Sequence, residues 1–132
     1  MRIDLKEKNH FKNVFEAFFD QPIIRPINGI SIDSRNIKKN DLFIAIGGKN
    51  FDGNDFVDQA LQGGASYTLS SNENESSYHL LVENLNVFIK ELLISWLKIF
   101  NGKIVGITGS NGKTTTKDLI AHLLQSKFKV EK

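Results

Sequence analysis

A glycine-rich segment near the end of the sequence has the residue types and spacing of a phosphate-binding loop. Residues 106–117 read GITGSNGKTTTK, and they follow an apolar stretch and lead into an amphipathic one. At such a strand–helix junction, glycines let the backbone turn tightly and bring N–H groups onto phosphate oxygens. The N-terminus of the helix adds unpaired N–H donors and a positive dipole end. We therefore predict that this segment binds the phosphates of a nucleotide.

The side chains of this loop have distinct predicted roles. Lys113 is the predicted catalytic residue, because its ammonium group can neutralise charge on the β- and γ-phosphates, and the Thr114 hydroxyl is a predicted ligand of Mg²⁺. The match to G-x-x-x-x-G-K-[ST] is incomplete, since Ile107 stands where the first glycine is required. Lys117 can share a helix face with Lys113, the alternative being a solvated surface lysine. The predicted phosphate contacts come from Gly109, Ser110, Asn111, Gly112, Lys113, Thr114 and Thr115.

The elements that must position this loop alternate between strands and helices, which predicts an α/β fold. Apolar runs and turn residues predict strands at 29–33, 42–46, 66–70, 79–82 and 103–108. Apolar residues at helical spacing predict helices at about 11–19, 56–61, 85–99 and from 113 onward. We expect Asn9 or His10 to cap the first helix and Asn54 or Asp55 the second. In the last helix, the residues expected to face inward are Leu119, Ile120, Leu123 and Leu124.

Composition limits the classes of protein that fit. The chain has 132 residues, 40% of them hydrophobic and 24% charged, which is typical of a globular domain with room for one core. A net charge of +2 gives no reason to expect nucleic-acid binding. No stretch is apolar for the ~20 residues that a membrane span needs, and the charged N-terminus shows no secretory signal. The absence of cysteine excludes a disulfide scaffold and fits a reducing compartment, as in a cytoplasmic enzyme.

Two separate segments resemble the Mur ligase family, whose members join amino acids or peptides to a nucleotide-linked peptidoglycan precursor. TGSNGKTTT at 108–116 is similar to the family's ATP-binding loop, including its departure from the strict pattern. Residues 31–69 resemble the N-terminal domain through the motifs DSR (33–35), DLFIA (41–45), FDG (51–53) and A-x-x-x-GA (60–65). Asn40 replaces the usual glycine before Asp41, which is tolerable because asparagine also accepts turn conformations.

The resemblance implies a domain organisation that length alone does not. Residues 1–100 would form a UDP-precursor-binding domain, and residues 101–132 would begin a central ATP-binding domain with its first strand, phosphate loop and helix. The expected boundary lies near Asn101-Gly102. Phe128–Lys132 resembles the start of a further strand, so we expect the chain to be the truncated N-terminal part of a larger ligase, inactive on its own and monomeric when complete.

The activity implied is ATP-driven amide formation through an acyl phosphate. Phe51 before Asp52-Gly53, and Lys117 after the loop, favour the member that adds D-Ala-D-Ala to UDP-N-acetylmuramoyl-tripeptide. The alternatives are the member that adds the third residue of the peptide stem and a non-catalytic UDP-sugar-binding module. An unrelated phosphate-loop kinase is disfavoured, because little chain follows the loop to build an acceptor site. The implied small-molecule partners are ATP with Mg²⁺, the UDP-precursor and D-Ala-D-Ala.

The resemblance also implies which residues face the UDP end of the precursor. These are Ser31, Asp33, Ser34, Arg35, Asp52 and Gly53. Arg35 has the chemistry to bind a phosphate or carboxylate in a fork, although a turn held by an Asp33–Arg35 contact is the alternative. For Asp52 and Gly53 the alternative is a simple Asp-Gly turn. The three histidines (10, 79 and 122) show no metal-ligand spacing and are interpreted as structural or surface residues.

Overall fold

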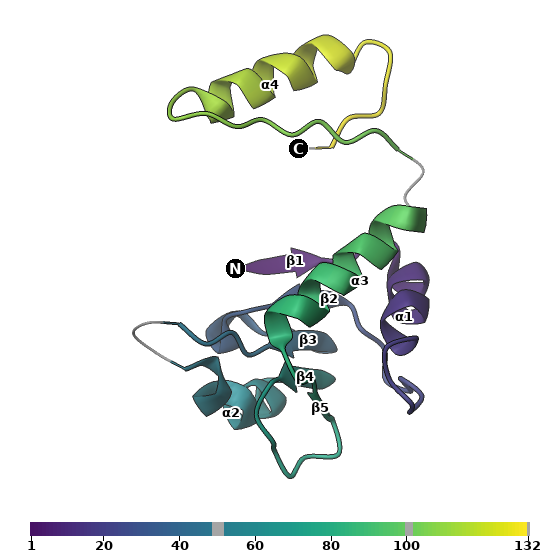
Figure 1. Cartoon of the computed structure of the whole chain (residues 1–132), viewed down its shortest axis with the longest axis vertical. Helices are drawn as coiled ribbons and strands as arrows, with labels where there is room; N and C mark the ends of the chain where they lie inside the picture. The colour runs from purple at the N-terminus through teal and green to yellow at the C-terminus, as the bar shows by residue number, and fades with distance from the viewer. Residues whose placement is uncertain (49–51, 100–101, 132) are drawn as a thin grey trace. The chain divides into compact units, whose positions relative to one another are not determined.

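The computed structural model describes residues 1–48, 52–99 and 102–131 and divides into two compact units, Met1–Phe100 and Asn101–Lys132 (Figure 1). The first unit contains a five-stranded sheet in the order β1-β2-β3-β4-β5. Its strands are β1 (Arg2–Asp4), β2 (Gly29–Ser31), β3 (Asp41–Ile44), β4 (Tyr67–Ser70) and β5 (His79–Leu81). The edge strand β1 runs antiparallel to β2, and the other neighbouring pairs are parallel.

Helices cover both faces of this sheet. They are α1 (Lys8–Glu16), α2 (Val57–Gln62) and α3 (Leu85–Ile99), with short 3₁₀ helices η1 (Ser34–Asn36) and η2 (Gly53–Phe56). Successive residues of a strand point to opposite faces, so Leu42 and Ile44 pack with α1 and α3, while Phe43 packs with α2. All four residues of β3 are buried, which explains its nearly continuous apolar sequence. The α/β fold predicted from the sequence is therefore confirmed.

Aromatic side chains hold the layer formed by α1 and α3. The predicted apolar stripe of the first helix is the core of the unit, since the fully buried Phe15 ring lies 5.4 Å from Phe11, 5.1 Å from Phe19 and 6.1 Å from Phe88. Rings at these separations add to the hydrophobic gain from burial. The two helices lie side by side in Figure 1.

Both helix caps expected from the sequence are wrong. Helix α1 begins after Glu7, whose carbonyl accepts from the Phe11 amide at 2.9 Å, so Asn9 and His10 lie inside the helix. Before α2, the chain first forms η2, and Asp52 caps it by accepting from the Asn54 amide at 3.0 Å. Asn54 and Asp55 are therefore members of η2, because the aspartate two residues earlier captures the free N–H group.

Strand β1 was not predicted, and an ion pair fastens it to the sheet. The Arg2 guanidinium donates from Nε and Nη2 to the fully buried Asp41 carboxylate at 2.6 and 2.8 Å. Asp41 also accepts from the Lys38 amide at 2.8 Å. Hydrogen bonds to Asp41, and then to Asp4, raise the pKa of Arg2 above its ordinary value. This bidentate fork joins residues 39 positions apart in the chain.

The second unit contains helix α4 (Lys113–Leu124), preceded by the glycine-rich loop. In the part of this unit that the structure describes, residues 103–108 form no strand, because no other strand is present to supply a hydrogen-bonding partner. The inward orientation expected for two leucines is also wrong, since Leu119 and Leu123 are 59% and 65% exposed. A helix buries its apolar face only where another layer covers it. Among the described residues of the chain, no helix has the length and apolarity to cross a bilayer.

Candidate functional site

A cavity of about 470 Å³ lies at the carboxyl ends of β2 and β3. In sheets with parallel strands, this edge is where ligands usually bind, because the loops that follow the strands converge there. The cavity combines apolar walls with polar and charged groups, and most of its residues follow β2 or belong to η2 and α2. The residues lining it are Met1, Ile32, Asp33, Ser34, Arg35, Phe43, Gly53, Phe56 and Gln59.

Asp33 and Arg35 form a tight local pair at this cavity. Asp33 caps η1 through the Arg35 amide at 3.1 Å, and its carboxylate accepts from Arg35 Nε at 2.9 Å and Nη2 at 3.0 Å. These hydrogen bonds lower the pKa of Asp33 to about 2. Asn36 Nδ2 also donates to this carboxylate at 2.9 Å. Both carboxylate oxygens are thus engaged, so Asp33 positions Arg35 and has little capacity left for a ligand.

Arg35 keeps donor capacity. Its side chain is 80% exposed, and within the described residues no acceptor binds its Nη1. The turn held by an Asp33–Arg35 contact is present, and that contact also fixes the guanidinium plane at the rim of the cavity. A guanidinium held in this way offers its outer edge to a phosphate or carboxylate group.

Ser31 is not among the residues that line the cavity. It is fully buried, its hydroxyl donates to the Asp33 carbonyl at 2.9 Å, and it accepts from the Asp33 amide at 3.1 Å. These bonds shape the exit of β2, so the structure gives Ser31 a supporting position. Ser34, by contrast, lines the cavity, where its hydroxyl donates to Gln59 Oε1 at 2.7 Å.

The Asp52-Gly53 pair divides between two roles. Asp52 accepts from the Asn54 amide and, at 2.5 Å, from Asn54 Nδ2, and it is not among the cavity residues. Gly53 is buried in the cavity wall, and a Cβ atom there would lie 2.6 Å from the Ile46 carbonyl oxygen. The Asp-Gly turn is therefore present in the structure. The absence of a side chain at Gly53 also lets the backbone of Ala45 and Ile46 lie close to it. Phe51, the third member of the motif, lies outside the described residues.

Five cavity residues were not anticipated from the sequence: Met1, Ile32, Phe43, Phe56 and Gln59. Phe56 and Gln59 stand three positions apart, Phe56 at the end of η2 and Gln59 in α2, so their side chains share a side of this continuous helical segment. Their spacing is visible in the sequence, but the apolar character of Phe56 equally fits the buried face that Val57 and Ala60 form. Val57 and Ala60 are buried, whereas Phe56 is 37% exposed and lines the cavity.

The predicted phosphate loop has open, exposed geometry. Gly109 (φ +153°) and Gly112 (φ +75°) adopt conformations that side-chain-bearing residues rarely reach, and α4 begins at Lys113. Lys113 Nζ donates to the Gly109 carbonyl at 2.5 Å, so the ammonium group lies over the loop. Residues 108–119 are exposed. The unpaired N–H groups of the first helical turn, the ammonium and the Thr114 hydroxyl fit a nucleotide phosphate with a bound Mg²⁺.

Other polar clusters do not suggest a catalytic centre. Within the described ranges, no group of three His, Cys, Asp or Glu residues could hold a metal ion. His79 is engaged with the Thr68 hydroxyl through Nδ1 at 2.9 Å and with the Asn72 carbonyl through Nε2 at 2.9 Å. Lys117 Nζ lies 3.8 Å from Asp118 and its side chain is 47% exposed, a surface position.

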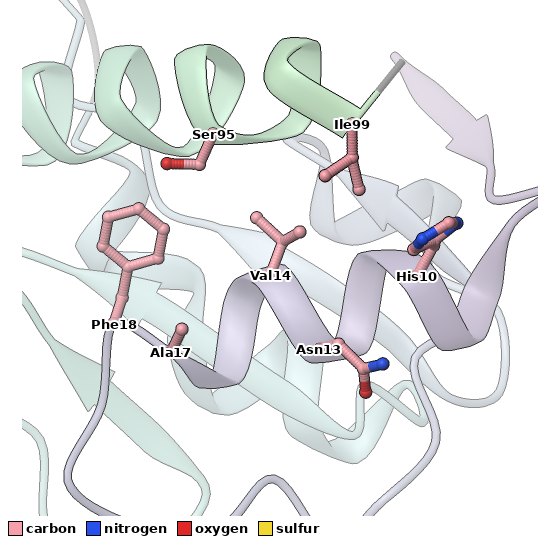
Figure 2. Close-up of a pocket in the computed structure, with 7 residues that line it drawn as sticks. All are labelled: His10, Asn13, Val14, Ala17, Phe18, Ser95 and Ile99. Atoms are coloured by element: carbon pink, nitrogen blue, oxygen red, sulfur yellow. The ribbon is translucent and has the colours of Figure 1, made fainter. Parts of the chain in front are cut away.

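A second hollow, of about 550 Å³, lies between α1 and α3 (Figure 2). Val14 of α1 and Phe18, which follows this helix, face Ser95 and Ile99 of α3 across it. His10, Asn13 and Ala17 lie alongside. It has no permanently charged side chain and no convergent set of polar groups. The cavity beside Arg35 is therefore the better candidate for a polar, anionic ligand.

Comparison with known proteins matches two stretches of the chain to described families. Residues 26–95 match the "Mur ligase family, catalytic domain", and residues 107–132 match the "Mur ligase middle domain". The chain is 36% identical over 110 residues to the UDP-N-acetylmuramoyl-tripeptide–D-alanyl-D-alanine ligase of Bacillus subtilis, covering 80% of the chain and 24% of the relative. It is 40% identical over 121 residues to the UDP-N-acetylmuramoyl-L-alanyl-D-glutamate–2,6-diaminopimelate ligase of Haemophilus influenzae, covering 80% and 25%.

A solved structure agrees with these matches. The MurF ligase of Thermotoga maritima in complex with ADP superposes with a TM-score of 0.66 and 38% sequence identity, over 74% of the chain and 23% of that protein. The chain thus spans about a quarter of the length of the curated relatives it matches (24% and 25%).

Proposed function

Because this chain belongs to the Mur ligase family, we propose that it is the N-terminal part of an ATP-dependent amide ligase that adds D-alanyl-D-alanine to UDP-N-acetylmuramoyl-tripeptide. The observation that supports the proposal is the occurrence in one chain of two features whose chemistry suits an anion: the cavity beside Arg35 and the loop ending in Lys113 and Thr114. Such a ligase needs both, since it must hold a nucleotide-linked acceptor and a nucleoside triphosphate. Residues 1–100 form the precursor-binding domain, and residues 101–132 belong to the ATP-binding domain.

In the first domain, we assign the UDP end of the precursor to the 470 Å³ cavity. Arg35, held in plane by Asp33, binds a phosphate group at the rim. Ser34 and Gly53 line the wall, while Ser31 and Asp52 support the two turns from behind. This assignment keeps all six residues of the expected substrate set in the site but divides them between contact and support.

In the second domain, the backbone from Gly109 to Thr115 cradles the phosphates of ATP, with Ser110, Asn111 and Gly112 between. Bound ATP supplies the γ-phosphoryl group that activates the precursor carboxylate as an acyl phosphate for attack by the dipeptide amine. The Lys113 ammonium must leave the Gly109 carbonyl to reach phosphate oxygens, and there it neutralises charge that builds up during transfer. We assign the Thr114 hydroxyl as a ligand of Mg²⁺.

Similarity to diaminopimelate ligases supports a second candidate activity, addition of the third residue of the peptide stem. Lys117 after the loop, together with similarity to the Bacillus and Thermotoga proteins, favours the D-Ala-D-Ala activity. We further propose that the enzyme acts as a monomer in the cytoplasm, and the cysteine-free composition is consistent with a reducing compartment.

The test uses the full product of the gene that encodes this chain, with ATP and Mg²⁺ present. We expect phosphate release to depend on UDP-N-acetylmuramoyl-tripeptide together with D-Ala-D-Ala. Release with the dipeptide precursor and diaminopimelate instead would establish the second candidate. Release with neither pair would refute the assignment to these ligases. The 132-residue chain alone is expected to release none, because it spans a quarter of its relatives.

A further inference from the structure

The glycine-rich loop contains an asparagine followed directly by a glycine, a pair with a chemistry of its own. The sequence has three such pairs, at 28–29, 101–102 and 111–112. In an Asn-Gly pair, the backbone nitrogen of the glycine attacks the side-chain amide carbon of the asparagine, because glycine has no Cβ atom to hinder the approach. The first and the last pair lie wholly within the described residues, and their surroundings differ.

The pair at 28–29 is held in the sheet. Gly29 is buried at the start of β2, which lies between β1 and β3. The Asn28 amide donates to the Asn40 carbonyl at 2.7 Å, and the Asn28 carbonyl accepts from the Leu5 amide at 3.0 Å. A Cβ atom on Gly29 would lie 2.6 Å from Arg2 Nη2, so little space surrounds this backbone. Its nitrogen therefore reaches the Asn28 side chain only when the sheet opens locally.

The pair at 111–112 has none of these restraints. Asn111 and Gly112 are exposed, and a Cβ atom on Gly112 would meet nothing within 4 Å beyond its chain neighbours. Across the described parts of the chain, neither the Gly112 N–H nor the Asn111 side chain has a hydrogen-bond partner. The Lys113 ammonium, held over the loop, and the N-terminus of α4 put positive charge near this nitrogen. Positive charge favours the deprotonated nitrogen, which is the form that attacks.

We propose that Asn111 is a site of spontaneous deamidation and that this modification ends nucleotide binding by the loop. The Gly112 nitrogen loses its proton and forms a bond to Asn111 Cγ, while the bond from Cγ to Nδ2 breaks and ammonia leaves. The product is a cyclic succinimide. Water then opens the ring at one of its two carbonyl carbons and leaves aspartate or isoaspartate, so the reaction consumes one water and needs no oxidant or cofactor.

Both products place a carboxylate among the groups assigned to phosphate oxygens, and like charges brought together in a binding site reduce affinity. Isoaspartate also carries the main chain through its side chain, which adds one backbone atom before Gly112 and displaces the N–H groups that follow. This inference rests on the proposed function, in which the backbone from Gly109 to Thr115 cradles the phosphates of ATP.

The first experiment compares the two pairs within one molecule. The 132-residue chain is incubated at mildly alkaline pH and cut after lysine, and mass spectrometry of peptides 13–38 and 104–113 measures conversion of amide to acid. In the folded chain we expect Asn111 to convert at least about 10-fold faster than Asn28, which reacts only through local opening. In guanidinium chloride we expect the two rates to agree within about 3-fold, because unfolding removes the restraints on Asn28. Equal rates in the folded chain, or a ratio that the denaturant leaves unchanged, would overturn the inference.

The second experiment measures ADP binding by calorimetry in the full product of the gene. Asn111→Asp reproduces one product of the reaction, and we expect it to weaken binding at least about 10-fold. Gln125→Glu is the matched control, since it makes the same change from amide to carboxylate at an exposed position of the same unit outside the loop, and it should keep the wild-type affinity. Equal affinity of the two variants would overturn the inference and leave the proposed function standing. Failure of the wild type to bind ADP would overturn both.

Discussion

Substituting Gly53 with alanine tests how closely the cavity wall is packed. A Cβ atom at this position would lie 2.6 Å from the Ile46 carbonyl oxygen, 2.7 Å from the Ile46 amide nitrogen and 2.8 Å from the Ala45 carbonyl carbon. All three are backbone atoms of the segment after β3, so they cannot rotate away as a side chain can. The backbone conformation itself accepts alanine, because Gly53 is not among the glycines with positive φ. The expected effect is therefore steric.

The size of the effect follows from the overlap. Forcing a methyl group into a packed region costs about 1–3 kcal/mol. Alanine also restricts the unfolded chain, which offsets up to about 1 kcal/mol. We expect a net loss of about 1–2 kcal/mol in the free energy of unfolding, or roughly a 5-fold to 30-fold change in the unfolding equilibrium. At a urea dependence of about 2 kcal/mol per molar, the midpoint would fall by about 0.5–1 M.

Trp96 provides the assay, because it is the only tryptophan in the sequence and its ring lies 6.0 Å from Phe11 in the first unit. Its fluorescence in urea therefore follows unfolding of the unit that contains the cavity. Gly47→Ala is the control, since a Cβ atom there meets only Asp52 Oδ1, at 3.8 Å. We expect the control to stay within about 0.5 kcal/mol of the wild type. A Gly53→Ala variant as stable as this control would refute the steric argument.

Three further predictions concern the remaining parts of the site. In the folded chain Asp33 has a pKa of about 2, below the ordinary value near 3.9, so its contribution to stability is present above about pH 4 and is lost as the pH falls toward 2. Asp33→Asn should therefore flatten this part of the pH dependence of the urea midpoint. Asn40 has φ +67°, a left-handed conformation that strains valine but not glycine. Asn40→Val should therefore lower the free energy of unfolding by about 1–2 kcal/mol while Asn40→Gly changes it little, and equal effects of the two variants would contradict this argument. In calorimetry, Lys113→Ala should weaken ADP binding at least 10-fold, while Lys117→Ala, at the surface, should change it less than 3-fold. Equal losses of ADP affinity in the two variants would count against the assigned roles.

Much of the fold was predictable because buried strands and amphipathic helices have simple sequence patterns. The apolar run of β3 lies where it was expected. The first helix was expected at about 11–19 and spans Lys8–Glu16, so Phe18 and Phe19 of the aromatic stripe follow it. Strand β1 was missed because it has three residues and its stability comes from a distant partner, Asp41. The strand at 103–108 was predicted from local apolarity, but a strand also needs a neighbour, which local sequence does not report.

Four of the six residues that the family resemblance implied for the UDP end of the precursor line the cavity. Asp33, Ser34, Arg35 and Gly53 all line the cavity, and Asn40 adopts the left-handed conformation that its replacement of glycine suggested. Gln59 could not be found in this way, because its relation to Ser34 depends on how α2 packs across the end of the sheet. The burial of Ser31 could not be predicted either, because the sequence beside a motif does not distinguish a serine that faces a ligand from one that faces the core.

The strands lie in the sheet in the same order as in the chain, and this order affects how the first unit folds during synthesis. As the polypeptide leaves the ribosome, each new strand of the first unit can pair at once with the strand before it. The residues that line the cavity, Met1 and members of the segment from Ile32 to Gln59, are all synthesised before β4 and α3. The core beneath α1 closes only when Phe88 and Leu92 emerge with α3. During synthesis, the residues that line the cavity thus emerge before those that complete the hydrophobic layer, and the apolar face of the sheet is covered by α3 only afterwards.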